Sequence, residues 1–249
     1  MIEIANLYKT FHAGKVNEVK ALQGLNVKFN AGEFVIVIGS NGSGKSTLLN
    51  CISGNIFPNG GSIIIDGNEV TRLAEHKRSK WIARVFQNPL SGTASDLSIL
   101  ENFRLAALRT TNKNLSIGIN NDFTKLVKDK ISMLGMGLEN KILQPMGTLS
   151  GGQRQALTLL MAVMDDVKIL LLDEPTAALD PRSAEIVMEI ANKLISDYKL
   201  TAILITHSMK EAYQYGNRII QMAEGKVIRD LSKEEKVKIT HNELYGWFM

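Results

Sequence analysis

The stretch that decides the fold is Gly39-Ser-Asn-Gly-Ser-Gly-Lys45-Ser46-Thr47, which follows the apolar run Glu33-Phe-Val-Ile-Val-Ile38. It matches the pattern GxxxxGK[ST] of phosphate-binding loops. The apolar run before it is typical of a strand buried on both faces of a parallel sheet, and we expect a helix from Lys45 to Ser53 after it. A glycine-rich turn with an incidental lysine is the alternative. A strand before the loop and a helix after it favour nucleotide binding.

Different residues of the loop are expected to contact different parts of a bound nucleotide. Glycines let backbone N–H groups turn toward the β-phosphate, and the N-terminus of the helix adds partial positive charge. The Lys45 amine reaches the β- and γ-phosphates, and the Ser46 hydroxyl can bind Mg²⁺. We therefore expect ATP contacts from Gly39, Ser40, Asn41, Gly42, Ser43, Gly44, Lys45, Ser46 and Thr47.

Two carboxylates end a second apolar run, Lys168-Ile-Leu-Leu-Leu172. Asp173 and Glu174 would be costly at the end of a buried strand without a cation or hydrogen bonds. We expect Asp173 to hold a metal-bound water and Glu174 to polarise the attacking water as general base. Pro175 disfavours helical backbone at Glu174. Alone, this triplet would be a strand-ending turn, and the Lys45 loop favours the catalytic interpretation.

Two more polar residues follow predicted strands. Gln87 ends the strand Arg84–Gln87, where its amide can reach a metal or water, and His207 follows the strand Thr201–Ile205, where a neutral imidazole could hydrogen-bond the γ-phosphate. Either residue alone would be an ordinary polar side chain. The remaining histidines show no ligand spacing, and we expect His12, His76 and His241 at the surface.

A third motif, Leu149-Ser-Gly-Gly-Gln153, precedes a predicted helix from Arg154 to Met164. Its serine and glycines fall where a helix N-terminus presents free N–H groups to an anion. Ser150 as a plain N-cap is the alternative. That alternative explains a serine but not two glycines, which weaken a helix start unless the backbone must approach something closely.

The other segments alternate between strand and helix patterns. Strands are predicted in Met1–Phe11 and Gly61–Gly67, and a charged helical stretch in Arg72–Lys80. A helical insert runs from Pro89 to Met164, with a loop at Thr110–Asp122. Asp180 is predicted as the N-cap, and Pro181 as the first residue, of a helix that ends at Ser196. Gly225 is predicted to form the turn of a hairpin in Asn217–Asp230.

Composition limits the class of protein. The chain has 249 residues, 45% of them hydrophobic, which is enough for a substantial core. Its apolar runs fall short of the roughly 20 residues that span a bilayer, and its start does not resemble a signal peptide, so we expect a cytoplasmic protein. The net charge of +4 is too small to argue for nucleic acid. The single cysteine, Cys51, excludes an internal disulfide.

The order of these motifs resembles that of the nucleotide-binding subunit of ABC transporters, and the resemblance covers nearly the whole chain. The motifs are the loop, Gln87, Leu149–Gln153, Asp173-Glu174, Ala178-Leu-Asp180 and His207. The resemblance implies an α/β fold of the ABC ATPase type: a P-loop NTPase core with a mainly parallel sheet, an N-terminal antiparallel β part and a helical subdomain insert. It implies a single domain, 1–249, with the core in 1–88 and 165–230, the helical subdomain in 89–164 and a C-terminal extension in 231–249.

The same resemblance implies how ATP is held. In that family two subunits face head to tail, and each ATP lies between the loop of one and the signature motif of the other. Ser150, Gly151, Gly152 and Gln153 would thus bind ATP in trans, and Asp180 would lie between the two sites. Phe11 matches the aromatic that stacks on adenine, with Tyr8 as a nearby alternative. Lys45, Glu174 and His207 would be catalytic, and Ser46, Gln87 and Asp173 would hold Mg²⁺.

The partners follow from the family as well. They are a second copy of the chain or a paralogous ATPase, transmembrane permease subunits that dock on Pro89–Asn102, and indirectly a substrate-binding protein. The subunit would be peripheral at the cytoplasmic face of the membrane and soluble when isolated, with no nucleic-acid partner.

A narrower similarity concerns Gly92-Thr-Ala, Leu149–Ala162, Thr176–Pro181 and Gly216–Ile220. These resemble a bacterial branch of importer ATPases that accompany a periplasmic or lipoprotein binding component, some of them linked to aromatic amino acids. The alternative is a soluble ABC ATPase, for example in iron–sulfur cluster assembly, whose signature usually departs from Ser-Gly-Gly-Gln. A binding module without turnover is not favoured, since Glu174 and His207 are both present.

Overall fold

The computed structural model describes residues 1–109 and 118–247, and the chain forms two compact units. The first comprises Met1–Arg78, Leu171–Asp173 and Lys199–Met249, and the second comprises Ser79–Leu170 and Glu174–Tyr198. Residues 110–117 of the predicted loop Thr110–Asp122 lie outside the described residues. The last two residues of that predicted loop already belong to helix α4 (Asn121–Ser132).

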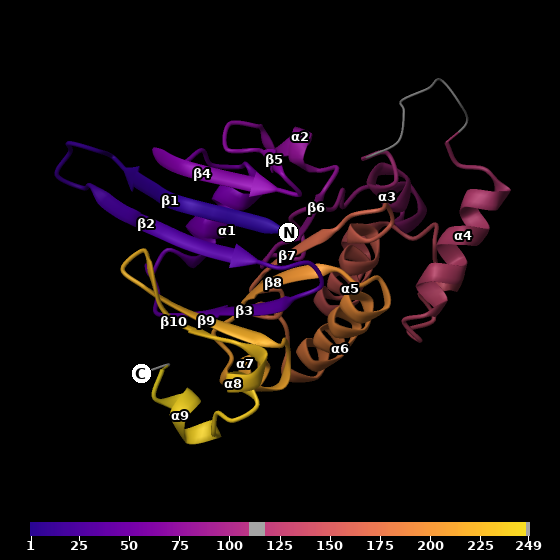
Figure 1. The fold of residues 1–249 in the computed structure, drawn as a ribbon. Helices are drawn as coiled ribbons and strands as arrows, with labels where there is room; N and C mark the ends of the chain where they lie inside the picture. The colour runs from indigo at the N-terminus through magenta and orange to yellow at the C-terminus, as the bar shows by residue number, and fades with distance from the viewer. Residues whose placement is uncertain (110–117, 248–249) are drawn as a thin grey trace. The chain divides into compact units, whose positions relative to one another are not determined.

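An antiparallel sheet opens the first unit, with the strand order β2-β1-β4-β5 (Figure 1). Its strands are β1 (Ile2–Phe11), β2 (Val19–Phe29), β4 (Gly60–Ile65) and β5 (Asn68–Glu69). β1 lies between β2 and β4 and is antiparallel to both. The buried residues of β1, Ile2, Ile4 and Leu7, lie on the core side of this sheet. The N-terminal antiparallel part expected from the sequence is therefore confirmed.

A second sheet has six strands in the order β10-β9-β3-β8-β7-β6. These are β3 (Phe34–Ile38), β6 (Ile82–Val85), β7 (Ile169–Asp173), β8 (Thr201–Ile205), β9 (Arg218–Ala223) and β10 (Lys226–Leu231). β3 pairs in parallel with β8 on one side and β9 on the other, and all five of its side chains are buried. This confirms the two-faced burial that its apolar run predicts. The predicted hairpin is also present, with Gly225 at its turn at a φ of 73°.

Helices complete both units. In the first unit they are α1 (Lys45–Ser53), α2 (Glu75–Arg78), α7 (Met209–Gln214), α8 (Lys233–Lys236) and α9 (His241–Tyr245). In the second they are α3 (Ile99–Ala106), α4, α5 (Gly151–Ala162) and α6 (Pro181–Asp197). α5 and α6 lie side by side (Figure 1). The bounds of α1 match the prediction, and α6 ends one residue later than expected.

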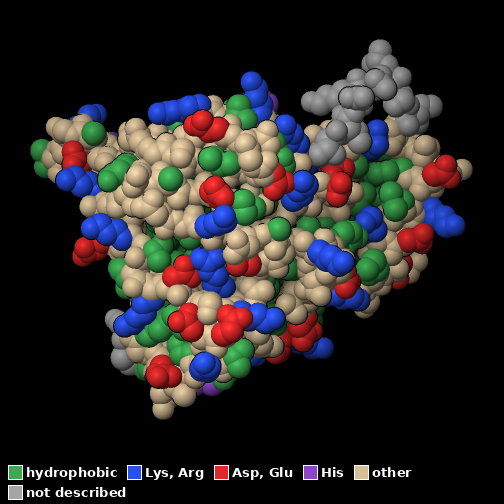
Figure 2. Space-filling view, in the orientation of Figure 1, with side chains coloured by type: hydrophobic (Ala, Val, Ile, Leu, Met, Phe, Trp, Pro, Cys, Tyr) green, Lys and Arg blue, Asp and Glu red, His purple; other side chains and the backbone are tan. Residues whose placement is uncertain are grey.

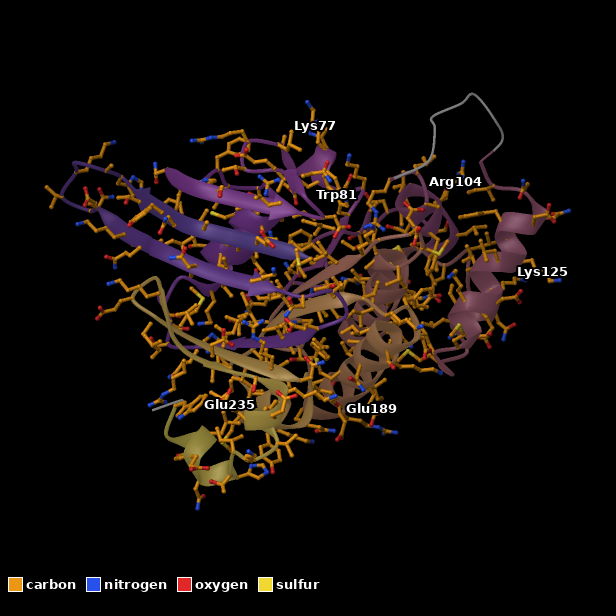
Figure 3. All side chains as sticks on the ribbon, viewed as in Figure 1. Lys77, Trp81, Arg104, Lys125, Glu189 and Glu235 are labelled. Carbon is orange, nitrogen blue, oxygen red and sulfur yellow. The ribbon has the colours of Figure 1, made fainter. Side chains whose placement is uncertain are left out.

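Three elements differ from the sequence prediction. β6 occupies Ile82–Val85 and not Arg84–Gln87. The chain is already fixed at the preceding residue, Trp81 (labelled in Figure 3), because the Trp81 carbonyl accepts hydrogen bonds from the N–H groups of Lys168 at 3.0 Å and Ile169 at 2.9 Å. The helix predicted in Arg72–Lys80 is confined to Glu75–Arg78.

The third difference is helix α5, which begins at Gly151 and ends at Ala162, whereas Arg154–Met164 was expected. Its N-cap is Ser150, so the capping side chain sets the start in spite of the low helix propensity of the two glycines that follow.

The surface and the helices also bear on partners. Basic and acidic side chains are interspersed over the face shown in Figure 2, with no extended field of one sign. Among residues 1–109 and 118–247, no helix has both the length and the apolar composition needed to cross a membrane.

Candidate nucleotide site

The loop between β3 and α1 depends on its glycines. Gly39, Gly42 and Gly44 have φ values of 149°, 79° and 101°, a region that side-chain-bearing residues rarely adopt. Space is limiting as well: a Cβ atom would lie 2.2 Å from the Met222 carbonyl oxygen at Gly39 and 2.4 Å from the Ala21 carbonyl oxygen at Gly44. The glycines therefore allow neighbouring backbone to pack directly against the loop.

The turn of the β9–β10 hairpin braces this loop. Its Gly225 N–H donates to the Ser43 carbonyl at 3.0 Å, and its Gly225 carbonyl accepts from the Gln23 N–H at 3.0 Å. The Gln23 amide also donates to the Glu224 carbonyl at 2.8 Å. The loop is thus held between β2 and the hairpin turn, which nothing in the loop sequence itself indicates.

Lys45 places a positive charge inside the loop. It is the first residue of α1 and is only 5% exposed. Its amine donates to the carbonyls of Gly39 at 2.8 Å and Ser40 at 3.0 Å. A cation held by loop carbonyls, beside the N-terminus of a helix, is well placed to pair with phosphate oxygens.

The structure brings Ser46 and Asp173 together. The Ser46 hydroxyl lies 3.3 Å from Oδ1 of Asp173, the last residue of β7. A hydroxyl and a carboxylate oxygen side by side suit a hard cation such as Mg²⁺, whose remaining ligands are usually phosphate oxygens and water. The donor set of these two residues therefore fits the metal that the sequence implies.

Glu174 has unusual backbone. Its φ of 48° lies in the left-handed region, which is uncommon for a residue with a side chain. Pro175 correctly predicts that Glu174 avoids the right-handed helical conformation, but not that it turns left-handed. Such outliers concentrate at functional sites. Glu174 and Gln87, which follows β6, both belong to the second unit.

His207 is exposed at the end of a well-fixed turn. The Thr206 hydroxyl, which is buried, donates to the Glu211 carboxylate and accepts from the Ser208 N–H at 3.0 Å. Ser208 in turn is the N-cap of α7, accepting from the Glu211 N–H. These hydrogen bonds hold the backbone on both sides of His207 while its imidazole faces outward.

Ser150 is the N-cap of α5 in a reciprocal capping box with Gln153. The Gln153 N–H donates to the Ser150 hydroxyl at 3.3 Å, and the Ser150 N–H donates to the Gln153 side chain at 3.2 Å. The local capping role is therefore confirmed. It leaves the hydroxyl proton of Ser150, which is exposed, able to donate to an anion.

The two signature glycines have different surroundings. A Cβ atom on Gly152 would lie 2.8 Å from both Cβ and Oγ of Ser183, in the first turn of α6, so packing of α5 on α6 requires this glycine. A Cβ atom on Gly151 would meet only the Leu179 side-chain end at 3.1 Å. The sequence predicts that these glycines allow a close approach of the backbone. At Gly152 the approaching group is Ser183 of the same chain.

Asp180 caps α6 as predicted. Its side chain accepts from the Ser183 N–H at 3.1 Å. Hydrogen bonding by the Ser183 side chain and by this N–H holds the pKa of the Asp180 carboxyl below its ordinary value. Ser183 therefore contacts both the cap of α6 and Gly152 of the signature, which links these two motifs inside the second unit.

The candidate adenine partners differ in their surroundings. Phe11 ends β1 with the Lys9 amine 5.1 Å from its ring centroid. Tyr8 is half-exposed. Its hydroxyl oxygen would lie 2.7 Å from a Cβ atom added to Gly24 of β2. The Tyr8 ring thus rests on the antiparallel sheet.

Sequence reasoning missed two buried arginines near these motifs. Arg154 follows the signature and donates to the carbonyls of Met146, Gly147 and Leu149, at 2.9 to 3.2 Å. Arg78 is fully buried and donates to four carbonyls, two of them in the last turn of α1, those of Cys51 at 2.7 Å and Ile52 at 2.8 Å. Neither has a sequence signal, because the acceptors are backbone atoms.

Known proteins share this sequence pattern and fold. A family model described as ABC transporter matches residues 22–177. The chain is 39% identical over 250 residues to a tyrosine transport ATP-binding protein of Clostridioides difficile, covering 100% of this chain and 98% of that protein. It is 33% identical over 256 residues to the phosphonates import ATP-binding protein PhnC of Lactobacillus acidophilus, covering 99% and 95%.

Solved structures agree in fold. The dimeric structure of MJ0796, a bacterial ABC transporter cassette, is similar with a TM-score of 0.80 at 30% identity, covering 94% of this chain and 99% of that one. The same cassette in a dimeric post-hydrolysis state bound to ADP and Pi has a TM-score of 0.79. The α/β cassette fold expected from the sequence is thus confirmed.

Proposed function

We propose a transport function from one premise: this chain belongs to the ABC transporter family and is an ATPase of that family. It is the ATP-binding subunit of a membrane transporter. The observation that carries the catalytic part is the packing of Lys45, Ser46 and Asp173 in one unit, with the Ser46 hydroxyl 3.3 Å from Asp173. Similarity over the full length to a tyrosine transport subunit supports the transport part.

Different residues of the chain have different roles in ATP hydrolysis. Lys45 and the N–H groups of Gly39 to Thr47 bind the phosphates, with Phe11 against the adenine. Ser46, Asp173 and Gln87 hold Mg²⁺, which neutralises phosphate charge when bound. Glu174 accepts a proton from the attacking water, and His207 donates a hydrogen bond to the γ-phosphate. Leaving-group charge is stabilised by the Lys45 amine.

The active form is a pair of cassettes. Ser150, Gly151, Gly152 and Gln153 complete the ATP site of the second copy, and Asp180 lies between the two sites. The exposed Ser150 hydroxyl and the free N–H groups at the start of α5 support this role, as does the dimeric state of a structural relative. ATP binding closes the pair, and hydrolysis lets it reopen.

The permease docks on the second unit at Pro89–Asn102. Gly92, Ala94 and Asn102 of this segment line a hollow of about 270 Å³. Leu105, Ala106 and Met161 line it too, which suits a permease segment bearing apolar side chains. The subunit would then sit at the cytoplasmic face of the membrane.

The transported compound is an aromatic amino acid of the tyrosine type, and the direction is import. The 39% identity to the tyrosine transport protein over the whole chain supports this more strongly than the 33% identity to a phosphonates import protein. A soluble assembly ATPase is not favoured, since these relatives are named for transport.

Purification of the tagged subunit from detergent-solubilised membranes of its native cells tests this function. We expect a permease and a substrate-binding protein among the companions, and uptake of labelled tyrosine that is lost when the gene is deleted. Companions that are all soluble proteins would overturn the transport role, and unchanged tyrosine uptake with a permease present would overturn only the substrate.

A further inference from the structure

Gln155 is a fully buried polar residue on the signature helix α5. Its side-chain amide Nε2 donates to the Phe86 carbonyl at 2.9 Å and to the Pro175 carbonyl at 2.8 Å. All three residues belong to the second unit. An amide nitrogen has two protons, so both donors of this side chain are used on backbone carbonyls of two separate segments.

The two acceptors adjoin the residues that the proposed chemistry needs most. Phe86 precedes Gln87, and its carbonyl shares a planar peptide unit with the Gln87 N–H. Pro175 follows Glu174, whose φ of 48° is unfavourable for a residue with a side chain. Strained backbone persists only where the surrounding structure determines it, and the hydrogen bond to Pro175 fixes the segment directly after Glu174.

Gln155 also shares a rigid element with Ser150, which is the N-cap of the same helix. Hydrogen bonds within α5 transmit a displacement of its N-terminus to the second turn. One side chain therefore connects the helix that presents Ser150 to the segments that carry Gln87 and Glu174.

We propose that Gln155 is a positioning residue for ATP hydrolysis: it holds the segments of Gln87 and Glu174 in fixed register with the signature helix. This inference rests on the proposed function, because it assumes the catalytic roles of Gln87 and Glu174. The Gln155 amide nitrogen donates to backbone carbonyls and the side chain is fully buried, so it acts through these residues and not on ATP.

The test compares Gln155→Met with the matched substitution Gln221→Met in the purified full chain. Gln221 is also buried, and its amide donates to the Trp247 carbonyl at 2.9 Å within the first unit. Both substitutions remove an amide of the same size, so their effects on Tm report the structural cost. Their effects on kcat and on the Kd for ATP report positioning.

We expect Gln155→Met to lower kcat by about 10-fold or more while the Kd for ATP, measured with a fluorescent analogue, changes less than about 2-fold. Gln221→Met should keep kcat within about 2-fold of the wild type at a similar loss of Tm. Equal kcat losses in the two variants, or a joint loss of kcat and ATP binding in Gln155→Met, would overturn the inference.

If Gln155→Met does not fold, Gln155→Asn provides the same test. Its amide is one methylene shorter and can reach one carbonyl at most, so the drop in kcat should persist with ATP binding retained, whereas a wild-type kcat would overturn the inference. A wild-type chain that hydrolyses no ATP would refute the proposed function itself. A wild-type chain that is active, with Gln155→Met equally active, refutes only the positioning role.

Discussion

The Ser46 hydroxyl lies 3.3 Å from the Asp173 carboxylate, although 127 positions separate the two residues in the chain. Ser46 is fixed by the first turn of α1 and Asp173 by the end of β7. Two motifs that lie far apart in the sequence thus bring a hydroxyl and a carboxylate oxygen together, next to Lys45 in the chain.

Asp173→Ala should reduce Mg²⁺-dependent ATPase activity by about 100-fold, because it removes one of the three residues that would hold Mg²⁺. Binding of ATP in EDTA should change little, since the loop and Lys45 are intact. Asp166→Asn is the control, as Asp166 is exposed and precedes the strand. Phosphate release assays measure both, and wild-type activity in Asp173→Ala would contradict the metal assignment.

Arg78→Met should lower the free energy of unfolding by about 3 kcal/mol, because four backbone carbonyls, three of them in buried hydrogen bonds, lose their donor. The guanidinium is expensive to bury, and burial lowers the pKa of Arg78 to about 10, yet it supports the last turn of α1. Urea unfolding measures the change. Arg72→Met, at an exposed position, should cost less than about 1 kcal/mol, and equal costs would refute the special role of Arg78.

Gly152→Ala should destabilise the protein more than Gly151→Ala, because only the first places a methyl group 2.8 Å from Ser183. The cost should be about 1 to 3 kcal/mol. Ser183→Gly removes the opposing side chain and should restore part of that stability in the double variant. A double-mutant cycle by urea unfolding gives the coupling energy. Additive effects would show that Gly152 and Ser183 do not press on each other.

The Cys51 thiol should resist alkylation at pH 8 in the folded protein and react quickly in urea, since it is fully buried and burial raises its pKa to about 11 from 9.0. Between pH 9 and 11 the folded chain keeps a proton that the unfolded chain loses. The thiol's contribution is therefore complete below pH 9 and lost as the pH rises through 11. Relative to Cys51→Ala, the wild type should lose stability over this window, and a constant difference would contradict the shift.

Local signals in the sequence predict much of this fold. The start of α1 follows from the loop glycines and the start of α6 from Asp180 and Pro181, because caps and turn residues act on their immediate neighbours. The burial of β3 follows from its unbroken apolar run. The order of the motifs in turn identifies the family.

Other features depend on contacts that no local pattern records. The position of β6 is set by the Trp81 carbonyl and the start of β7, and the loop of Lys45 is braced by a hairpin turn at Gly225. Gln155 and Arg78 donate hydrogen bonds to backbone carbonyls of distant segments. Every residue has a backbone carbonyl, so the sequence gives no signal for these acceptors. The requirement for Gly152 likewise appears only when Ser183 is seen against it.

The central claim is that Lys45 of one copy and Ser150 of another form a single ATP site. Glu174→Gln should abolish steady phosphate release while ATP still binds, so the pair should be trapped closed. The decisive measurement is the molar mass of this variant by light scattering with ATP. We predict twice the monomer mass, and a monomer that still binds ATP when Ser150→Arg is added. A dimer that persists in the Ser150→Arg form, or a Glu174→Gln chain that stays monomeric with ATP bound, would contradict the shared site.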